Sequence, residues 1–343
     1  MNRDYWIEYI NLNIQDEEKR LIYYELLNRL IENSLPILLK FENFEFLFKI
    51  KKEILALIYK DSRKFYRTFT IPKRNGSLRF IQSPLPLLQY IQRYILDEIL
   101  SKIITHNNAF GFVKHKSIVD NVKPHLNSHT LLKLDIDNFF PSIKIKRVIS
   151  IFQRLGYSNR ISFLLAKFCC YDDSLPQGAP TSPYLSNIIA KRLDSRLYNL
   201  AKEHHLKYSR YADDMTFSGN HISKNFIDFA YKILIDEGFT PNYTKSKLIV
   251  GRGRKIITGL SISNKKITIP RNKKRELRSK AYSVLSSDAK YKINYAAIDD
   301  PIFVERLIGQ FSFWNFVEPD NLYAVNTLKL LKEYSSQLDN LIE

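Results

Sequence analysis

The sequence predicts an α+β fold on three observations. Apolar residues at helical spacing run through residues 1 to about 60, and two β-rich runs follow across an Asn75-Gly76 turn. Beyond them, short apolar strands alternate with helices up to about residue 270. A chain of 343 residues with 45% hydrophobic and 13% aromatic content can bury a substantial core. We therefore expect a globular protein.

The individual elements follow from local patterns. The run "FYRTFTIPKRNGSLRFIQSPLP" predicts a hairpin, because Asn-Gly is a strong two-residue hairpin signal. Residues 87–104 predict a helix, residues 128–143 a strand entering an acidic turn, and residues from 271 a basic helix. Two apolar sets predict N-terminal helices with one packed face each: Ile22, Leu26 and Leu30, and Ile50, Ile54, Leu57 and Ile58.

Charge limits the choice of partner. The chain has 53 Lys and Arg against 35 Asp and Glu, a net charge of +18, which favours a polyanion, either nucleic acid or an anionic membrane surface. No run approaches the roughly 18 apolar residues of a membrane span, and the start lacks a signal peptide, so a cytoplasmic protein is expected. The adjacent Cys169 and Cys170 exclude a disulfide framework and a cysteine zinc site, and are predicted to be core residues.

Two acidic pairs stand out in this basic chain. Asp135 and Asp137 end the apolar run "LLKLDID", where a strand's period of two would direct both to one face. Asp213 and Asp214 sit at the bend of a strand-turn-strand pattern in "RYADDMTFS". If the strands are neighbours, the carboxylates repel one another unless cations neutralise them, and ligands that are all oxygen favour Mg²⁺. Alternatively, each pair caps its own turn.

The surrounding blocks resemble a reverse transcriptase. "LDIDNFFPSI", "LPQGAPTSP", "RYADDMTFSG" and "PNYTKSKLIVG" occur in that order after the basic hairpin "IPKRNGSLRFIQSP", and the resemblance covers roughly residues 65–270. It implies a right-hand polymerase fold with fingers, palm and a small helical thumb. The expected domains are an N-terminal helical region (1–64), fingers with a retron-specific block (65–127), a palm with the catalytic acids (128–262) and a helical thumb (263–343).

The resemblance also implies roles for residues of the acidic blocks. Asp135 and Asp213 match the family's metal-holding acids, with Asp214 completing the set, and the role of Asp137 stays open. Lys245 lies near the family's lysine beside the pyrophosphate leaving group, which makes it a candidate general acid.

Further positions match the family's site for dNTPs. Phe140 stands at the position of the steric gate against a 2′-hydroxyl, although a core Phe is the alternative. Gln177 and Gly178 resemble the turn that packs on nucleotide and template, where Gly allows close backbone approach. Lys73 and Arg79 match cationic positions that neutralise the triphosphate.

Two blocks resemble those of bacterial retron enzymes. "SIVDNVKPH" is similar to their Asn-Ala-x-x-His block, with Val122 in place of Ala, and "IITGLSIS" to their Val-Thr-Gly block, with Ile257 in place of Val. His125 taken alone would more often be a packed or surface histidine. The basic run after residue 270 is either a solvated helix face or a phosphate-contacting one. The RNA-binding candidates are therefore Asn121, His125, Thr258, Gly259, Arg271, Lys273, Lys274, Arg275 and Arg278.

A retron enzyme would copy part of a cognate structured non-coding RNA into single-stranded DNA. By resemblance, synthesis starts from a guanosine 2′-hydroxyl, the product is RNA-linked msDNA, and a separate effector protein joins it in antiphage defence. About 80 residues follow the Thr-Gly block, enough for a thumb and too few for a ribonuclease H domain. The alternatives are a group II intron-like or abortive-infection reverse transcriptase, and a non-catalytic RNA-binding scaffold with a polymerase fold.

Overall fold

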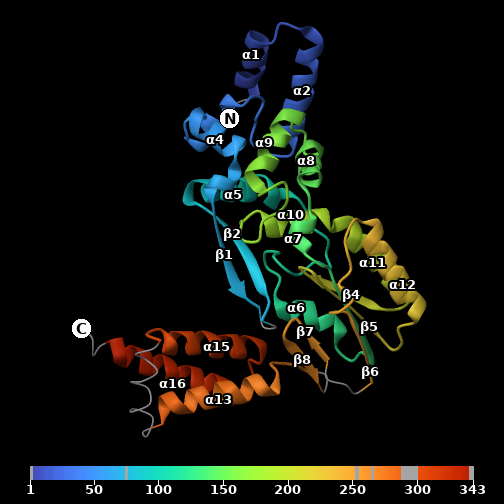
Figure 1. Ribbon diagram of the computed structural model, residues 1–343, viewed down its shortest axis with the longest axis vertical. Helices are drawn as coiled ribbons and strands as arrows, with labels where there is room; N and C mark the ends of the chain where they lie inside the picture. Colours follow the sequence, from blue (N-terminus) through green and yellow to red (C-terminus); the bar gives the residue numbers. More distant parts are fainter. Residues whose placement is uncertain (1–2, 74–75, 252–254, 264–265, 287–299, 340–343) are drawn as a thin grey trace.

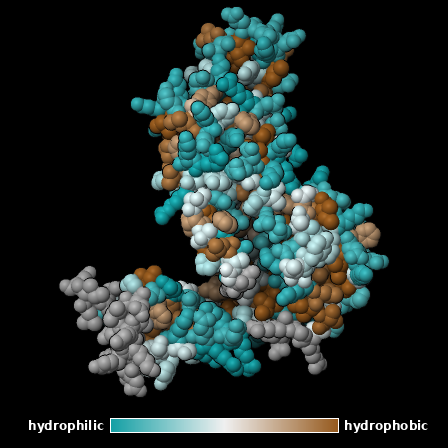
Figure 2. All heavy atoms as spheres, in the orientation of Figure 1, coloured by the Kyte–Doolittle hydropathy of each residue, from teal (hydrophilic) through white to brown (hydrophobic). Residues whose placement is uncertain are grey.

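The computed structural model describes every residue except 1–2, 74–75, 252–254, 264–265, 287–299 and 340–343. The molecule is elongated: the N-terminal helices form one end, and a C-terminal bundle of three helices (α13, α15 and α16) forms the other (Figure 1). A two-stranded hairpin and a four-stranded sheet lie between these ends. Figure 2 shows the outline hollowed between the hairpin side of the body and the C-terminal bundle.

Helices make up most of the described chain. In order they are α1 (Arg3–Asn13), α2 (Glu17–Glu32), α3 (Glu42–Phe48), α4 (Lys52–Lys60), η1 (Ser62–Phe65), α5 (Pro86–Glu98), η2 (Leu100–Lys102), α6 (Ile118–Val122), η3 (Lys123–His125), α7 (Phe139–Ser142), α8 (Ile145–Arg154), α9 (Asn159–Cys169), α10 (Ser182–Ile189), α11 (Lys191–Glu203), α12 (Lys224–Asp236), α13 (Arg271–Leu285), α15 (Phe303–Val317) and α16 (Leu322–Asp339).

The described strands form three antiparallel sheets: β1-β2, β4-β5-β3-β6 and β7-β8-β9. They are β1 (Tyr66–Pro72), β2 (Leu78–Pro84), β3 (Thr130–Asp135), β4 (Lys207–Tyr211), β5 (Asp214–Gly219), β6 (Lys247–Val250), β7 (Lys255–Ile257), β8 (Leu260–Ser263) and β9 (Lys266–Thr268). The predicted hairpin is confirmed as β1-β2, although Asn75 of its turn lies outside the described residues. The strand before Asp135 and the strand-turn-strand around Asp213 are confirmed as well.

Two apolar clusters hold the described chain together. The larger joins the N-terminal helices to α5, α8, α9 and the helices that cover the four-stranded sheet. The second contains Trp314 and Phe311 of the C-terminal bundle, and it reaches Leu131 of β3 and Val122 of α6. The bundle is therefore tied to the sheet through apolar contacts, which fixes one wall of the hollow.

The structure confirms the α+β class and corrects some local expectations. Cys169 and Cys170 are free and buried, as predicted. The predicted apolar faces are wrong at Ile22, Ile54 and Leu57, which are exposed because the buried faces are centred on their neighbours Leu27, Leu55 and Ile58. The helix predicted over 87–104 ends at Glu98 and continues as a short 3₁₀ turn. Within the described residues, no helix combines the length and apolarity of a membrane span.

Candidate active site

The two acidic blocks meet at one end of the four-stranded sheet. β3 and β5 are antiparallel neighbours whose register sets Asp135 directly opposite Asp214. The amide of Ile136 donates to the carbonyl of Asp213 at 3.2 Å, so the chain just beyond Asp135 is fastened to the β4-β5 turn. Side chains directly opposite one another on antiparallel strands have Cβ atoms about 5 Å apart. The register thus brings acids that are distant in sequence into direct electrostatic contact.

Burial makes ionisation of Asp135 and Asp214 unfavourable, and neighbouring negative charge adds to the effect. Burial raises the pKa of Asp135, Lys245 opposes the rise, and Asp213 and Asp214 add to it. Burial also raises the pKa of Asp214, with Asp213 contributing and Lys133 opposing. Like charges directly opposite on neighbouring strands are destabilising, so the site favours a cation beside its carboxylates.

Lys245 supplies that positive charge in the structure. Its Nζ lies 3.0 and 3.1 Å from the two oxygens of Asp135. The preceding loop is anchored at the same place, because the amide of Asn242 donates to the carbonyl of Asp135 at 2.8 Å. Burial alone would lower the pKa of Lys245, but Asp135, Asp213 and Asp214 outweigh it and the pKa is raised.

The donor set fits a hard divalent cation in chemistry but not in its present arrangement. Its ligands are carboxylate oxygens, which Mg²⁺ prefers. Within the described ranges, however, no three His, Cys, Asp or Glu side chains are arranged to hold a metal ion as they stand. The expectation that three carboxylates already converge is therefore not met, because both oxygens of Asp135 face the Lys245 ammonium, which takes a cation's place.

Asp137 lies just beyond β3, which ends at Asp135, and a bridge between Ile136 and Pro241 extends the pairing by one residue. That Asp137 shares the face of Asp135 stays a prediction. Asp137 is exposed, its amide donates to the carbonyl of Thr240 at 2.8 Å, and its carboxylate accepts from Asn138 at 2.9 Å.

The turn that carries Asp213 has an uncommon backbone. Tyr211 pairs with Asp214, so only Ala212 and Asp213 connect β4 to β5. Ala212 has φ +57°, in the left-handed region that residues with a Cβ rarely adopt. Such a conformation persists only where surrounding contacts enforce it.

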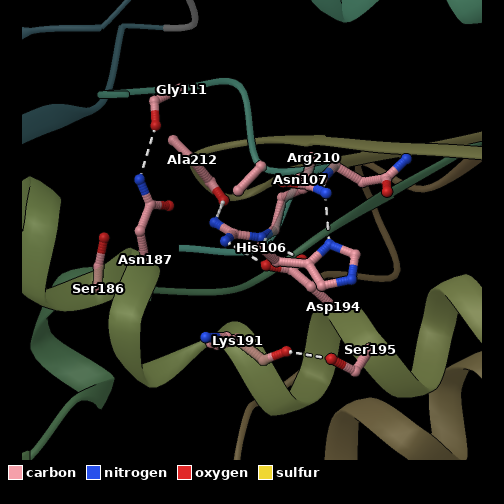
Figure 3. Close-up of polar contacts among 12 residues, drawn as sticks. His106, Asn107, Gly111, Ser186, Asn187, Lys191, Asp194, Ser195, Arg210 and Ala212 are labelled. Carbon is pink, nitrogen blue, oxygen red and sulfur yellow. Dashed lines mark hydrogen bonds and ion pairs between the residues drawn. The ribbon is translucent and has the colours of Figure 1, made fainter. Parts of the chain in front are cut away.

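A buried ion pair supplies one of these contacts (Figure 3). Arg210 and Asp194 of α11 are fully buried and joined by two hydrogen bonds of 2.7 Å. A third donor of the same guanidinium, Nη1, reaches the carbonyl of Ala212 at 3.0 Å. The hydroxyl of Tyr208 also donates to Asp194, at 2.7 Å. Burial would lower the pKa of Arg210, but Asp194 more than offsets it, so the cation is retained.

Gly111 supplies a second contact to the turn. A Cβ at Gly111 would lie 2.7 Å from the amide nitrogen of Ala212, so only glycine allows this approach. The Gly111 carbonyl accepts from Asn187 of α10 at 2.8 Å (Figure 3). These supporting residues were not identified from the sequence. Two features of the sequence could have indicated them: Arg210 lies close to the acidic pair, and glycine interrupts the segment around Gly111.

The hairpin packs on the turn that precedes α10. The amide of Gln82 donates to the carbonyl of Gln177 at 2.8 Å, and the amide of Gln177 donates to the Gln82 side chain at 3.0 Å. Gly178 has φ +137°, and a Cβ there would lie 2.5 Å from the carbonyl oxygen of Gln82. Lys73 and Arg79 are exposed on this hairpin.

Phe140 belongs to an aromatic group beside the acidic turn. It is half-buried, and its ring centroid lies 6.1 Å from that of Phe112, which in turn lies 6.3 Å from that of Tyr211. Phe139 is the buried member of the pair. Phe140 therefore keeps an accessible ring near Asp213.

Asn121 and His125 lie inside the protein. His125 is fully buried, with ring nitrogens 2.7 and 2.8 Å from the hydroxyls of Ser218 and Ser209, and burial lowers its pKa to about 3. Asn121 is buried and donates to Thr258 at 3.4 Å, so the two retron-like blocks meet. The expectation that Asn121 and His125 contact RNA directly is wrong, because their side chains are enclosed.

Thr258 and Gly259 lie at the rim of a cavity of about 980 Å³ between β7 and the C-terminal bundle. Both have positive φ, +45° and +84°. The side chain of Thr258 contacts Asn121, whereas a Cβ at Gly259 would meet open space.

The basic run on α13 divides into paired and unpaired cations. Lys274 is held by Glu318 at 2.6 Å, so it serves the bundle instead of offering a free charge. Arg278 stacks over Tyr323 at 4.8 Å, and Lys273 pairs with Glu276 at 2.9 Å. Three cations are exposed and have no carboxylate partner among the described residues: Arg271, Arg275 and Arg278. Arg271 and Arg275 also have no aromatic ring beneath them in that part of the chain.

Comparison with known proteins places this geometry in a family. The family model described as reverse transcriptase (RNA-dependent DNA polymerase) matches residues 71–287. The Retron Ec86 reverse transcriptase of Escherichia coli is 36% identical over 75% of this chain and 81% of that protein. The Retron Mx65 reverse transcriptase of Myxococcus xanthus is 32% identical over 66% of this chain and 57% of that protein. A solved foamy viral protease-reverse transcriptase has a TM-score of 0.40 and 15% identity, covering 80% of this chain and 44% of that one.

The role of the buried ion pair can be separated from its effect on stability. Arg210→Met leaves Asp194 buried and unpaired, and we expect it to lower the free energy of unfolding by about 3–5 kcal/mol. Tyr208→Phe/Asp194→Leu/Arg210→Met replaces the whole polar group with apolar side chains. We expect this variant to recover most of the stability in urea denaturation, yet to bind Mn²⁺ about tenfold more weakly, because the Ala212 carbonyl has lost its donor.

Tyr208→Phe alone is the matched control, since it keeps the three hydrogen bonds that Arg210 donates to Asp194 and Ala212. Wild-type Mn²⁺ affinity in the triple variant would show that the ion pair does not position the acidic turn.

Because the pKa of Asp214 is raised, we predict that replacing this acid increases the thermal stability of the protein, by an amount that depends on pH. An acid whose pKa is raised on folding loses stability as pH rises from its ordinary value, near 3.9, through the raised one. With a chelator present, Asp214→Asn should therefore raise the thermal midpoint at pH 7.5 and change it little near pH 4. Mg²⁺ should stabilise the wild type more than the variant.

Asp137→Asn, at an exposed carboxylate, serves as the control and should leave both midpoints unchanged. A thermal midpoint at pH 7.5 that is lower for Asp214→Asn than for the wild type would contradict the interpretation that the charged Asp214 destabilises the fold.

Proposed function

Because the chain belongs to the reverse transcriptase family, and within it to the retron reverse transcriptases, we propose that Asp135, Asp213 and Asp214 hold its catalytic divalent cations. The protein is an RNA-directed DNA polymerase with a right-hand polymerase fold, and enzymes of this family generally depend on divalent metal. The observation that carries the proposal is the register that sets Asp135 opposite Asp214, with Asp213 in the adjoining turn.

We assign Mg²⁺ as the cation because the donors are carboxylates. When bound, a pair of such ions activates the attacking hydroxyl and stabilises the leaving phosphate oxygen. Lys245 Nζ, 3.0 Å from Asp135, is our candidate for the proton donor to the departing pyrophosphate. Its raised pKa keeps this proton in place before the reaction.

The dNTP is proposed to lie between the hairpin and the acidic turn. Lys73 and Arg79 offer exposed cations for the triphosphate. Gln177 and Gly178 are held against Gln82 of the hairpin and so link it to the main body. The accessible ring of Phe140 is our candidate for the group that excludes a ribose 2′-hydroxyl.

The RNA is proposed to run along the C-terminal bundle, where hydrophilic side chains gather over α13 (Figure 2). Arg271 and Arg275 are exposed and, within the described part of the chain, have neither a carboxylate nor an aromatic partner, so both are suited to phosphate contact. Lys273 and Arg278 lie nearby on α13, and Thr258 and Gly259 line the cavity. Asn121 and His125 act from inside: Asn121 fixes the position of Thr258, and His125 links Ser209 of β4 to Ser218 of β5.

The proposed domains keep the boundaries 1–64, 65–127, 128–262 and 263–343. The last boundary falls within β8 (Leu260–Ser263), whose Leu260 belongs to the same apolar cluster as the C-terminal bundle. The small β7-β8-β9 sheet therefore acts as the base of the thumb.

The finer function is proposed from the kinship with retron enzymes. The protein would copy part of a cognate structured non-coding RNA, starting from a guanosine 2′-hydroxyl, and yield RNA-linked msDNA. A role in antiphage defence in the cytoplasm, with a separate effector protein, belongs to the same proposal.

The carboxylates can be tested apart from RNA binding. Asp213→Asn/Asp214→Asn should reduce DNA synthesis on a primed RNA with Mg²⁺ by at least a hundredfold, while the Kd for that RNA changes less than threefold. Asp137→Asn should retain both. Lost RNA affinity in the double variant would mean that the acids serve the fold, and retained synthesis would place the catalytic centre elsewhere.

The retron product can be tested on nucleic acid that copurifies with the protein. We expect a defined structured RNA joined to single-stranded DNA through a branch at a guanosine, seen as a debranching-sensitive species on sequencing. Unlinked DNA copied from varied RNAs would favour a group II intron-like or abortive-infection enzyme instead. RNA without any DNA, together with no dNTP incorporation, would favour a non-catalytic scaffold.

A further inference from the structure

A second concave site lies on the outer side of the helices that cover the four-stranded sheet. The cavity measures about 530 Å³, and it is formed by η2, α8, the end of α10, the start of α11 and the residue after α12. The α11 residues that line it, Lys191, Arg192 and Ser195, lie on a different side of that helix from the buried Leu193 and Leu197. Its apolar lining consists of aliphatic side chains: Ile103, Ile151, Leu155, Ile188 and Ile189.

Cations dominate the polar part of the lining. It carries four of them, Arg147, Arg154, Lys191 and Arg192, against one carboxylate, Glu237. Glu237 is already neutralised, because its two oxygens pair with Arg192 at 2.7 Å and with Arg196 at 2.9 Å.

Lys191 donates to the carbonyl of Ile104 at 2.9 Å, which leaves Arg147 and Arg154 as the cations offered to a ligand. Among the described residues, neither Arg147 nor Arg154 has a carboxylate within salt-bridge distance. Arg147 is half-buried over the ring of Phe239 at 4.7 Å. Burial lowers its pKa, the charge of Glu237 opposes the shift, and the neighbouring Arg192 adds to it. A further anion beside Arg147 would stabilise its charged form.

The spacing of the two arginines limits what they can hold. Arg147 and Arg154 are seven residues apart on α8, with Ser150 and Ile151 between them on the same face, so their backbones are separated by about 10 Å along the helix axis. The two guanidinium groups can therefore each take a separate anionic group. An extended peptide advances about 3.3 Å per residue, so acidic residues three apart would match this distance.

The lining also discriminates between classes of macromolecule. No aromatic side chain lines this cavity in the described part of the chain, whereas proteins that bind single-stranded nucleic acid stack its bases on aromatic rings. An aliphatic floor instead suits a leucine or isoleucine side chain. We propose that this cavity docks an acidic segment of a partner protein, with an aliphatic side chain on the floor and two carboxylates on Arg147 and Arg154.

The proposal can be tested on the full chain by fluorescence anisotropy. The probes are labelled peptides of about ten residues, each with one Leu or Ile flanked by two Asp or Glu at separations of two to four residues. Matched peptides carry Asn or Gln in place of the acids, and an oligouridylate of about twelve nucleotides represents RNA. Arg154→Glu is the test variant, because Arg154 is exposed and lies outside the proposed catalytic machinery.

Arg160→Glu is the matched control, since Arg160 is exposed on α9, outside the cavity, and its reversal changes net charge equally. We expect at least one acidic peptide to bind the wild type. Its affinity for Arg154→Glu should be about tenfold lower, and its affinity for Arg160→Glu should lie within twofold of the wild-type value. The amide peptide should also bind about tenfold more weakly. DNA synthesis and the thermal midpoint should stay unchanged in both variants.

Three results would overturn the proposal. The first is that Arg154→Glu weakens the binding of no peptide in the panel more than Arg160→Glu does. The second is equal binding of acidic and amide peptides, which would mean that the charges play no part. The third is an oligouridylate whose affinity depends on Arg154 while that of every peptide does not, which would make the cavity a nucleic-acid site.

Discussion

Burial of Asp135 and Asp214 beside Asp213 is what the surrounding contacts must accommodate, because burial raises the pKa of both carboxyls and Asp213 adds to the rise. The register of β3 against β5 sets two carboxylates opposite each other at a partly buried place, where their mutual charge is least tolerated. A fold that keeps them there needs a cation close by and a backbone that cannot relax away from the strain. The molecule meets the first need with the ammonium of Lys245 and the second with contacts behind the acidic turn.

The contacts behind the acidic turn include the buried Arg210–Asp194 ion pair, whose main effect is to position the backbone of the turn. Replacing a buried ion pair with apolar side chains is often neutral for stability, so the Arg210–Asp194 pair is poorly explained as a source of folding energy. Its third hydrogen bond explains it better, since Arg210 also holds the carbonyl of Ala212 in a backbone conformation that alanine disfavours. Gly111 fills the space behind Ala212 so closely that no larger residue fits. Helix α11, strand β4 and the segment before α6 thereby set the direction of one acidic turn.

Sequence reasoning reached the features that are local in the chain. The apolar run before Asp135, the Asn-Gly hairpin and the adjacency of Asp213 and Asp214 are each visible within about ten residues, and the ordered blocks gave the family. It failed where burial depends on distant partners. The sequence leaves His125 open between a packed or surface histidine and a recognition residue, and only the structure shows that Ser209 and Ser218 contact it from two strands. Asp194 is one acid within a charged helix, and the residues next to it in the sequence do not indicate that it pairs with Arg210. Similarly, Lys274 is one of several cations in its run until Glu318 is seen beside it.

We propose that the Lys245–Asp135 contact gives way to shared cations when substrate binds. The most direct measurement is anomalous diffraction from crystals of the protein with a primed RNA, a non-hydrolysable dNTP and Mn²⁺. We expect two manganese peaks about 3.5–4 Å apart, ligated by Asp135 and Asp213, with Lys245 Nζ moved away from Asp135. Peaks that avoid these carboxylates, or a Lys245–Asp135 pair that persists with substrate bound and no manganese beside it, would contradict the account.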